Sequence, residues 1–235
     1  MVIFFDIDGT LLDTGGAGWA ALQSAFAETF SVPVDQIPEV SLAGAVDSGL
    51  FLELHRELIE GLENATVSEV AVDQIYPRYV EILERNLRSN QFNPRLLTGA
   101  EALVKTCASL DGVTNALITG NILEGARAKL DRFGLWEQFQ FGGFGCDAPI
   151  RDAVAIAAVK RAQERGERGD PSTWWVLGDT PKDIACARAA GLRVAAVSTG
   201  GASTDELADA NPDVLLTDLS DCEQVLNILG VLPCG

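Results

Sequence analysis

The sequence predicts an α/β protein with a Rossmann-like, mostly parallel sheet and an inserted all-helical segment. The 235-residue chain opens on four apolar residues, 2–5, a run too short for a helix and typical of a buried strand. From Thr98 onward, strand-like apolar runs alternate with helix-like segments across short connections. Such alternation is typical of a parallel sheet covered by helices on both faces. Between these parts, residues 15–93 show helical spacing of apolar residues and no strand pattern.

The expected elements follow this division in chain order. The insert should hold about four helices, with the clearest helical spacing over residues 19–30, 49–62 and 67–87. Further helices are expected at 99–110, 122–133, 152–165 and 182–190, shortly after Ser203, and at 221–229. The expected strands after the first are 113–118, a short one near 138–141, 173–177, 193–197 and 214–216. We therefore expect a core domain of residues 1–14 and 94–235 and a helical cap domain of residues 15–93.

Composition narrows the class of partner. The formal net charge of −17 argues against a nucleic-acid partner, because phosphate backbones are bound by basic surfaces. The apolar start is too short for a signal peptide or a membrane span, so no membrane partner is expected. The five cysteines show no Cys-x-x-Cys spacing and are read as free thiols of a reducing, cytoplasmic compartment.

Two carboxylates at the end of the first strand are the main candidates for chemistry. Asp6 and Asp8 stand one residue apart, followed by Gly9 and Thr10. In parallel α/β sheets, ligands bind outside the carboxyl ends of the strands. Two such anions, roughly 4–6 Å apart, repel by a few kcal/mol at an effective dielectric near 20, so a shared proton or a divalent cation is needed. A carboxylate can also act as a nucleophile and form an aspartyl-phosphate.

Polar residues follow two other expected strands. Thr119 ends one of them and precedes a helix whose first N–H groups favour an anion. Asp179 ends another, and Asp183 stands four residues on, near the start of the next helix. Carboxylate oxygens of this kind suit Mg²⁺, which binds alongside a substrate phosphate. Arg151 places a cation at a further helix start.

These motifs resemble those of the haloacid dehalogenase-like (HAD) hydrolase superfamily, in its phosphoglycolate phosphatase-like branch. The first motif, Asp-x-Asp-Gly-Thr-Leu, is complete at residues 6–11. Thr119 matches the second motif, and Gly-Asp-Thr-x-x-Asp at residues 178–183 matches the fourth. The match covers residues 1–14 and 95–230. In this branch a helical (C1-type) cap follows the first motif, which implies the HAD fold with such a cap.

The resemblance implies a role for each matched residue. Asp6 would be the nucleophile and Asp8 the general acid and base. Mg²⁺ would be bound by Asp6, the backbone carbonyl of Asp8 and Asp179. Asp183 would either bind the ion directly or contact one of its ligands. The phosphoryl group would be bound by Gly9, Thr119, Gly120, Asn121 and Arg151, of which Thr119 and Arg151 also count as catalytic.

The chain departs from the family pattern in two places. The third motif is usually a lysine at a helix start, but here Arg151 stands there, and its planar fork can bind phosphate oxygens. Lys160, well inside the same helix, is the alternative for this role. The caps of this branch often carry Gly-Arg, whereas residues 44–48 read Gly-Ala-Val-Asp-Ser and offer no cation. This absence argues against phosphoglycolate itself as the substrate.

The expected activity is a Mg²⁺-dependent phosphatase that hydrolyses a small phosphorylated metabolite. A sugar phosphomutase on the same fold is the alternative. A haloacid dehalogenase is disfavoured because such enzymes need no metal and lack a counterpart of Asp8. A non-catalytic phosphate binder would have lost motif carboxylates, and a phosphorylation-receiver domain has no helical insert of this length. The substrate and the oligomeric state, monomer or homodimer, stay open.

Overall fold

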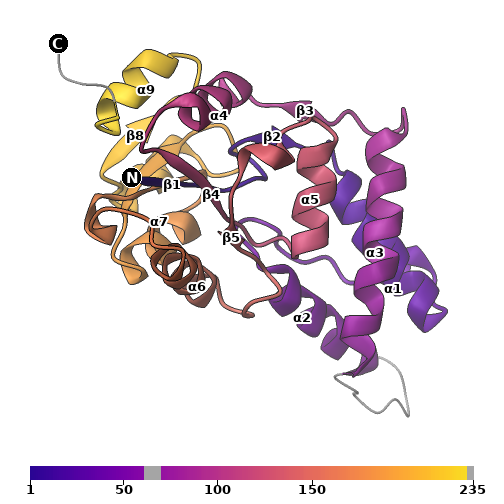
Figure 1. The fold of residues 1–235 in the computed structure, drawn as a ribbon. Coiled ribbons are helices and arrows are strands. Elements are labelled where there is room, and N and C mark those ends of the chain that lie inside the picture. Colours follow the sequence, from indigo (N-terminus) through magenta and orange to yellow (C-terminus); the bar gives the residue numbers. More distant parts are fainter. Residues whose placement is uncertain (61–69, 232–235) are drawn as a thin grey trace.

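A single parallel sheet forms the centre of the computed structural model, which describes residues 1–60 and 70–231. Six strands lie in the order β5-β4-β1-β6-β7-β8, and every neighbouring pair is parallel (Figure 1). Their bounds are β1 Val2–Phe5, β4 Thr114–Ile118, β5 Gly142–Gly143, β6 Trp175–Gly178, β7 Arg193–Val197 and β8 Val214–Leu216. This confirms the predicted fold class.

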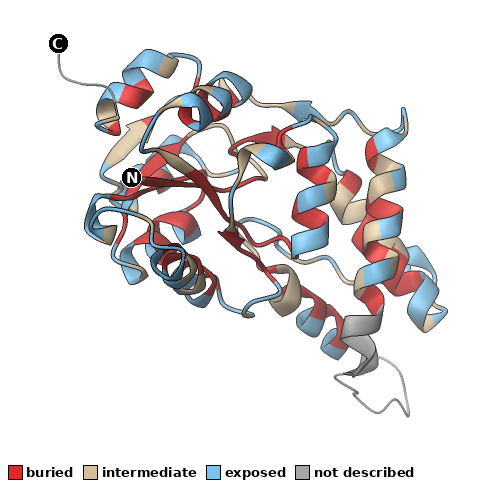
Figure 2. Ribbon diagram, viewed as in Figure 1, coloured by how far each residue is buried: buried red, intermediate tan, exposed pale blue. Residues whose placement is uncertain are grey.

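Helices cover both faces of the sheet. One face packs against α4 (Ala100–Ser109), α5 (Leu123–Asp131) and α9 (Cys222–Ile228). The other packs against α6 (Arg151–Glu164), α7 (Pro181–Ala189) and α8 (Thr204–Asp209). Because side chains alternate along a strand, Ile3 and Phe5 join the first apolar cluster, whereas Val2 and Phe4 join the second. The strand β1 is accordingly buried along its whole length, and most of the sheet is buried with it (Figure 2).

The inserted segment forms a second helical layer with its own apolar core. Its described elements are α1 (Ala17–Phe30), a 3₁₀ turn η1 (Val34–Gln36), α2 (Asp47–Glu60) and α3 (Val70–Arg88). The predicted helical residues 61–62 and 67–69 lie outside the described part of the chain. The chain leaves the sheet through β2 (Leu12–Asp13) and returns through β3 (Arg95–Leu96), and these two strands pair antiparallel. The exact domain boundaries stay a prediction.

One element differs from its predicted position. The strand expected near residues 138–141 is replaced by a 3₁₀ turn, η2 (Trp136–Gln138), and the strand itself is β5 at Gly142–Gly143. Phe139 and Phe141 pack their rings against Phe5 and Phe4, with centroids 5.8 and 6.1 Å apart. The apolar residues at 138–141 are therefore explained by packing against the core and not by a strand. A Cβ atom at Gly143 would clash with the backbone of α6, so this position of the strand requires glycine. Glycine is not typical of strands, which is why the sequence pattern did not predict β5 here.

Three further observations complete the description of the fold. In the described ranges, no helix is both long and apolar enough to cross a bilayer. The cysteines there are free thiols at positions 107, 146, 186 and 222, and Cys234 lies outside those ranges. Another 3₁₀ turn, η3 (Pro171–Thr173), precedes β6.

Candidate active site

The predicted site residues meet at the carboxyl end of the sheet. Thr119, Asp6 and Asp179 each follow directly on a strand, β4, β1 and β6, and these strands are neighbours. A cavity of about 340 Å³ lies at these strand ends and is lined from the other side by the helical insert. The position agrees with the rule that ligands of parallel α/β sheets bind where the strands end.

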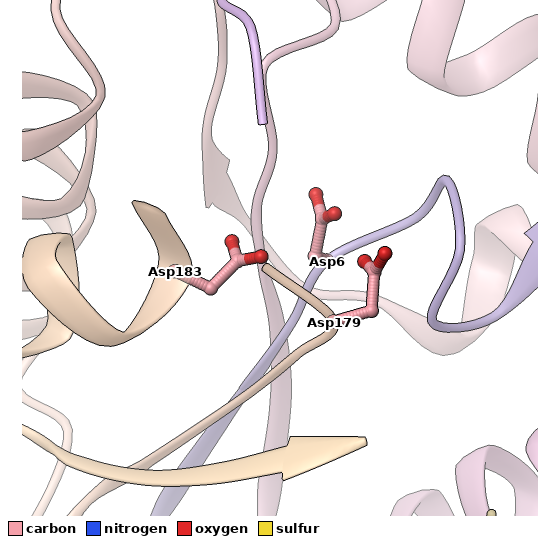
Figure 3. Close-up of side chains that lie close together, drawn as sticks. All are labelled: Asp6, Asp179 and Asp183. Atoms are coloured by element: carbon pink, nitrogen blue, oxygen red, sulfur yellow. The ribbon is translucent and has the colours of Figure 1, made fainter. Parts of the chain in front are cut away.

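Three buried carboxylates lie together at this edge. Oxygen atoms of Asp6, Asp179 and Asp183 all lie within 4.8 Å of one another (Figure 3). Burial, opposed by Arg151 and reinforced by Asp183, raises the pKa of Asp6 to about 7. Burial and the neighbouring Asp6 raise the pKa of Asp179 to about 8. The cluster therefore holds more negative charge than its surroundings neutralise.

The cluster fits a divalent cation. Hard carboxylate oxygens are the ligands that Mg²⁺ prefers. Burial is the main cause of the raised pKa values, and a cation would offset it and would also relieve the repulsion between the carboxylates. Gly9 has a φ of +83°, and a Cβ atom built there would collide with the carboxylate of Asp179. The same collision would occur at Gly200. The two glycines thus leave the space that the carboxylate of Asp179 occupies.

Asp183 is held by the start of α7. The Thr180 N–H and hydroxyl donate to its Oδ2 at 3.0 and 2.6 Å, and the Asp183 N–H donates to the Thr180 hydroxyl at 3.2 Å. This capping box satisfies free backbone N–H groups of the helix. Its other oxygen, Oδ1, accepts a hydrogen bond from Arg151. Asp183 therefore caps a helix and belongs to the carboxylate cluster at once.

Arg151 is the cation that the structure brings to the cluster. It is the first residue of α6, is buried, and its Nη2 lies 2.9 Å from Oδ1 of Asp6 while also contacting Asp183. Its buried Nε has no hydrogen-bond partner among the described residues. The rival, Lys160, is 74% exposed and faces Glu164 at 3.7 Å, on the outer side of α6. The geometry favours Arg151 over Lys160 for the third-motif position.

Asp8 belongs to a second network, with a residue that sequence reasoning missed. Lys129, buried in α5, donates to both Asp8 oxygens at 2.8 and 2.6 Å and to Oδ1 of Asn121 at 2.5 Å. Asn121 also donates to Oδ2 of Asp8 at 2.7 Å and to the hydroxyl of Thr119 at 2.8 Å. The signal was present in the sequence: Lys129 lies on the buried stripe of α5 with Ala126 and Leu130.

The loop after β4 connects the sheet to the insert. The carbonyl of Gly120 accepts a hydrogen bond of 2.7 Å from the backbone N–H of Asp47, and a Cβ atom at Gly120 would collide with the carbonyl of Ala45. Gly120 therefore permits close approach of the insert. All the residues expected to bind phosphate line the cavity, namely Gly9, Thr119, Gly120, Asn121 and Arg151.

Asp47 is a second residue whose place sequence reasoning did not foresee. It begins α2, lines the cavity from the side of the insert, and its Oδ2 accepts a 2.9 Å hydrogen bond from the N–H of Ile122. Burial raises its pKa to about 6, although the charge of Lys129 opposes the rise. The insert thus contributes a carboxylate to the wall of the cavity.

Comparison with known proteins identifies the family. Residues 3–188 match the model of the family described as haloacid dehalogenase-like hydrolase. The chain is 26% identical to the probable phosphatase IndB of Dickeya dadantii, over 94% of this chain and 90% of that protein. It is 24% identical to phosphoglycolate phosphatase 1 of Pseudomonas aeruginosa, over 100% of this chain and 79% of that protein.

A solved structure carries the same fold. The crystal structure of a predicted phosphoglycolate phosphatase from Haemophilus somnus superposes with a TM-score of 0.69 at 19% identity, covering 95% of this chain and 96% of that one. The family model spans most of the chain, including β1, β4 and β6 with the residues that follow them. The chain belongs to the haloacid dehalogenase-like hydrolase family.

Proposed function

We propose that this phosphoric monoester hydrolase is a Mg²⁺-dependent phosphatase that acts on a small organic phosphate monoester through an aspartyl-phosphate on Asp6. One observation carries the proposal. Asp6 belongs to a buried carboxylate cluster suited to a divalent cation, and it lines the same cavity as Asp179 and as Asp8, which a second network holds. Phosphoryl transfer needs mainly such alignment and charge stabilisation.

The metal would be bound by Asp6, Asp179, Asp183 and the backbone carbonyl of Asp8. When bound there, Mg²⁺ would neutralise charge on the phosphoryl oxygens and on the attacking carboxylate. The protein's own residues perform the bond changes. A carboxylate oxygen of Asp6 forms a bond to phosphorus while the ester P–O bond breaks, and Asp8 gives its proton to the leaving alkoxide.

The second half of the reaction regenerates the enzyme. Asp8, now a carboxylate, takes a proton from a water molecule whose oxygen attacks the phosphorus, and the bond between Asp6 and phosphorus breaks to release inorganic phosphate. The side chain of Asp8 is 44% exposed, which leaves it accessible to leaving group and water. Lys129 and Asn121 fix its orientation through three hydrogen bonds.

The donors around Asp6 would bind the phosphoryl oxygens. Thr119 and the backbone N–H groups near Gly9 and Asn121 lie at the cavity wall. Arg151 holds Asp6, and its Nε has no protein acceptor in the described part of the chain, so a phosphoryl oxygen would satisfy a donor that is otherwise unpaired. A guanidinium has five donors and can bind two carboxylates and an anion together.

The test is phosphate release from a panel of phosphorylated metabolites, with Mg²⁺ and with a chelator. We expect activity only with the metal, and we expect Asp6→Asn to abolish it. Asp35→Asn, a charge removal at an exposed position of the insert, is the matched control and should keep full activity. Undiminished turnover by Asp6→Asn would refute the nucleophile. Product analysis decides the alternative, because a sugar phosphomutase returns an isomeric sugar phosphate in place of inorganic phosphate.

We also propose a cytoplasmic location and a small-molecule partner. The described cysteines are unpaired, which suits a reducing compartment. The net charge of −17 disfavours nucleic acid. A monomer or a homodimer is expected, and light scattering of the purified chain distinguishes them.

A further inference from the structure

We infer that the alcohol released by this enzyme has an apolar face, carries a hydroxyl or amino donor for Asp47, and bears no carboxylate. The inference rests on the proposed phosphatase function and names the substrate class of the same site. It comes from the part of the cavity that faces away from the carboxylate cluster, where the leaving group must lie once the phosphoryl group is at Asp6.

The wall formed by the insert is mostly apolar. Its large side chains come from α1, from the segment before α2, from α2 and from α3, and they are Trp19, Leu22, Leu42, Leu50 and Tyr79. Such a wall favours a leaving group that buries hydrocarbon or ring surface, and each buried methylene adds to affinity. A ligand pocket of this kind uses a few polar groups to set orientation.

The cavity holds no uncommitted cation in the described ranges. Its cationic lining residues are Arg151 and Lys129, and both are already bound to carboxylates. Lys129 directs its contacts to Asp8 and Asn121. A carboxylate on the leaving group would therefore enter a partly buried space without a counter-charge, which is strongly unfavourable.

Asp47 adds a second reason why a leaving group with a carboxylate is disfavoured. Its Oδ2 accepts a hydrogen bond from the N–H of Ile122, but its Oδ1 has no hydrogen-bond partner within the described structure, although the residue lines the cavity. This oxygen is placed to accept a hydrogen bond from a substrate hydroxyl or amine, and charge-assisted bonds of this kind are strong. The same carboxylate repels a substrate carboxylate, so one residue both attracts one class and rejects the other.

Three phosphate esters of similar size test the inference: phosphoethanolamine, propyl phosphate and 2-phosphoglycolate. In the wild-type enzyme with Mg²⁺, we expect kcat/KM for both of the first two to exceed that for 2-phosphoglycolate by at least about tenfold. Phosphoethanolamine should also have the lowest KM, because its amine can donate to Asp47. A preference for 2-phosphoglycolate would overturn the inference while leaving the phosphatase function intact.

The variant Asp47→Asn assigns the effect to one residue. The amide keeps an oxygen for the Ile122 N–H, so the fold should be retained. We expect the ratio of kcat/KM for phosphoethanolamine to that for 2-phosphoglycolate to fall at least about fivefold, through KM. Comparing this ratio between variants cancels the intrinsic reactivity of the esters. Asp35→Asn should leave the ratio unchanged.

Each remaining result has a defined meaning. An unchanged ratio in Asp47→Asn would overturn the role of Asp47. If none of these esters, nor any member of the metabolite panel, releases phosphate in the presence of Mg²⁺, the proposed function itself fails and the substrate class fails with it.

Discussion

Replacing Arg151 by alanine should inactivate the enzyme far more than replacing Lys160. The guanidinium touches Asp6 at 2.9 Å and also Asp183, inside a cluster of three carboxylates. Its removal takes away the only basic side chain that contacts this cluster within the described structure and, under the proposed function, a donor for the phosphoryl oxygens. Loss of one well-placed donor at a transition state costs roughly 10²–10³ in kcat, or about 3–4 kcal/mol.

The same change should affect stability less than the contacts suggest. Breaking a buried ion pair costs about 3–5 kcal/mol when a bare charge is left behind. Here the pKa of Asp6 is already about 7, so the carboxylate can take up a proton and avoid much of that cost. We therefore expect Arg151→Ala to fold, with a free energy of unfolding lower by about 1–3 kcal/mol.

The assay is steady-state phosphate release with whichever ester the wild type turns over fastest, alongside urea unfolding of each variant. Lys160→Ala is the matched control, because Lys160 lies on the same helix and contacts only an exposed glutamate. It should stay within about twofold of wild type. Arg151→Lys keeps the charge but not the fork, and should recover part of the loss. A larger loss in Lys160→Ala than in Arg151→Ala would refute the assignment.

Three further predictions follow from other contacts. Lys129→Met should lower kcat by roughly 10–100-fold with little change in KM, because Asp8 loses the donor that orients it; a change confined to KM would contradict this. Burial raises the pKa of Asp47 to about 6 from about 4 in an unfolded chain, so the stability present below pH 4 is lost as pH rises through 6. Relative to wild type, Asp47→Asn should therefore gain roughly 1 kcal/mol of unfolding free energy between pH 5 and pH 8, measured in urea; a constant difference would refute the shift. Gly120→Ala should lower the melting temperature, because its Cβ atom would collide with the carbonyl of Ala45; an unchanged melting temperature would show that the insert adjusts freely.

The strand-end residues could be predicted because parallel topology fixes them. Asp6, Thr119 and Asp179 each follow a short apolar run, and parallel strands bring their carboxyl ends to one edge wherever the runs are adjacent in the sheet. Arg151 could be placed because a helix start after a strand points to the same edge. No information about side-chain packing was needed for any of these.

Other features depend on tertiary contacts that spacing does not encode. Asp47 reaches the cavity only because the insert folds back and its backbone N–H binds the carbonyl of Gly120. Lys129 is 121 residues from Asp8 in the chain. Its place on the apolar stripe of a helix indicates that the ammonium needs a buried partner, but the sequence does not show which residue that is. The strand β5 consists of two glycines, and nothing in their sequence distinguishes a strand from a turn.

As the proposed counterpart of the third-motif lysine, Arg151 has a physical use beyond carrying the same charge. A lysine would present one compact ammonium to Asp6 and Asp183, and its three donors would be largely spent on them. Arg151 meets both carboxylates through a single nitrogen, Nη2, and keeps Nε without a partner among the described residues. Three carboxylates against one guanidinium also leave two formal negative charges, the number that one divalent cation balances. Under the proposed function, arginine would thus fix the geometry of the cluster while a donor stays available for the phosphoryl group, and a bound divalent cation would supply the remaining charge.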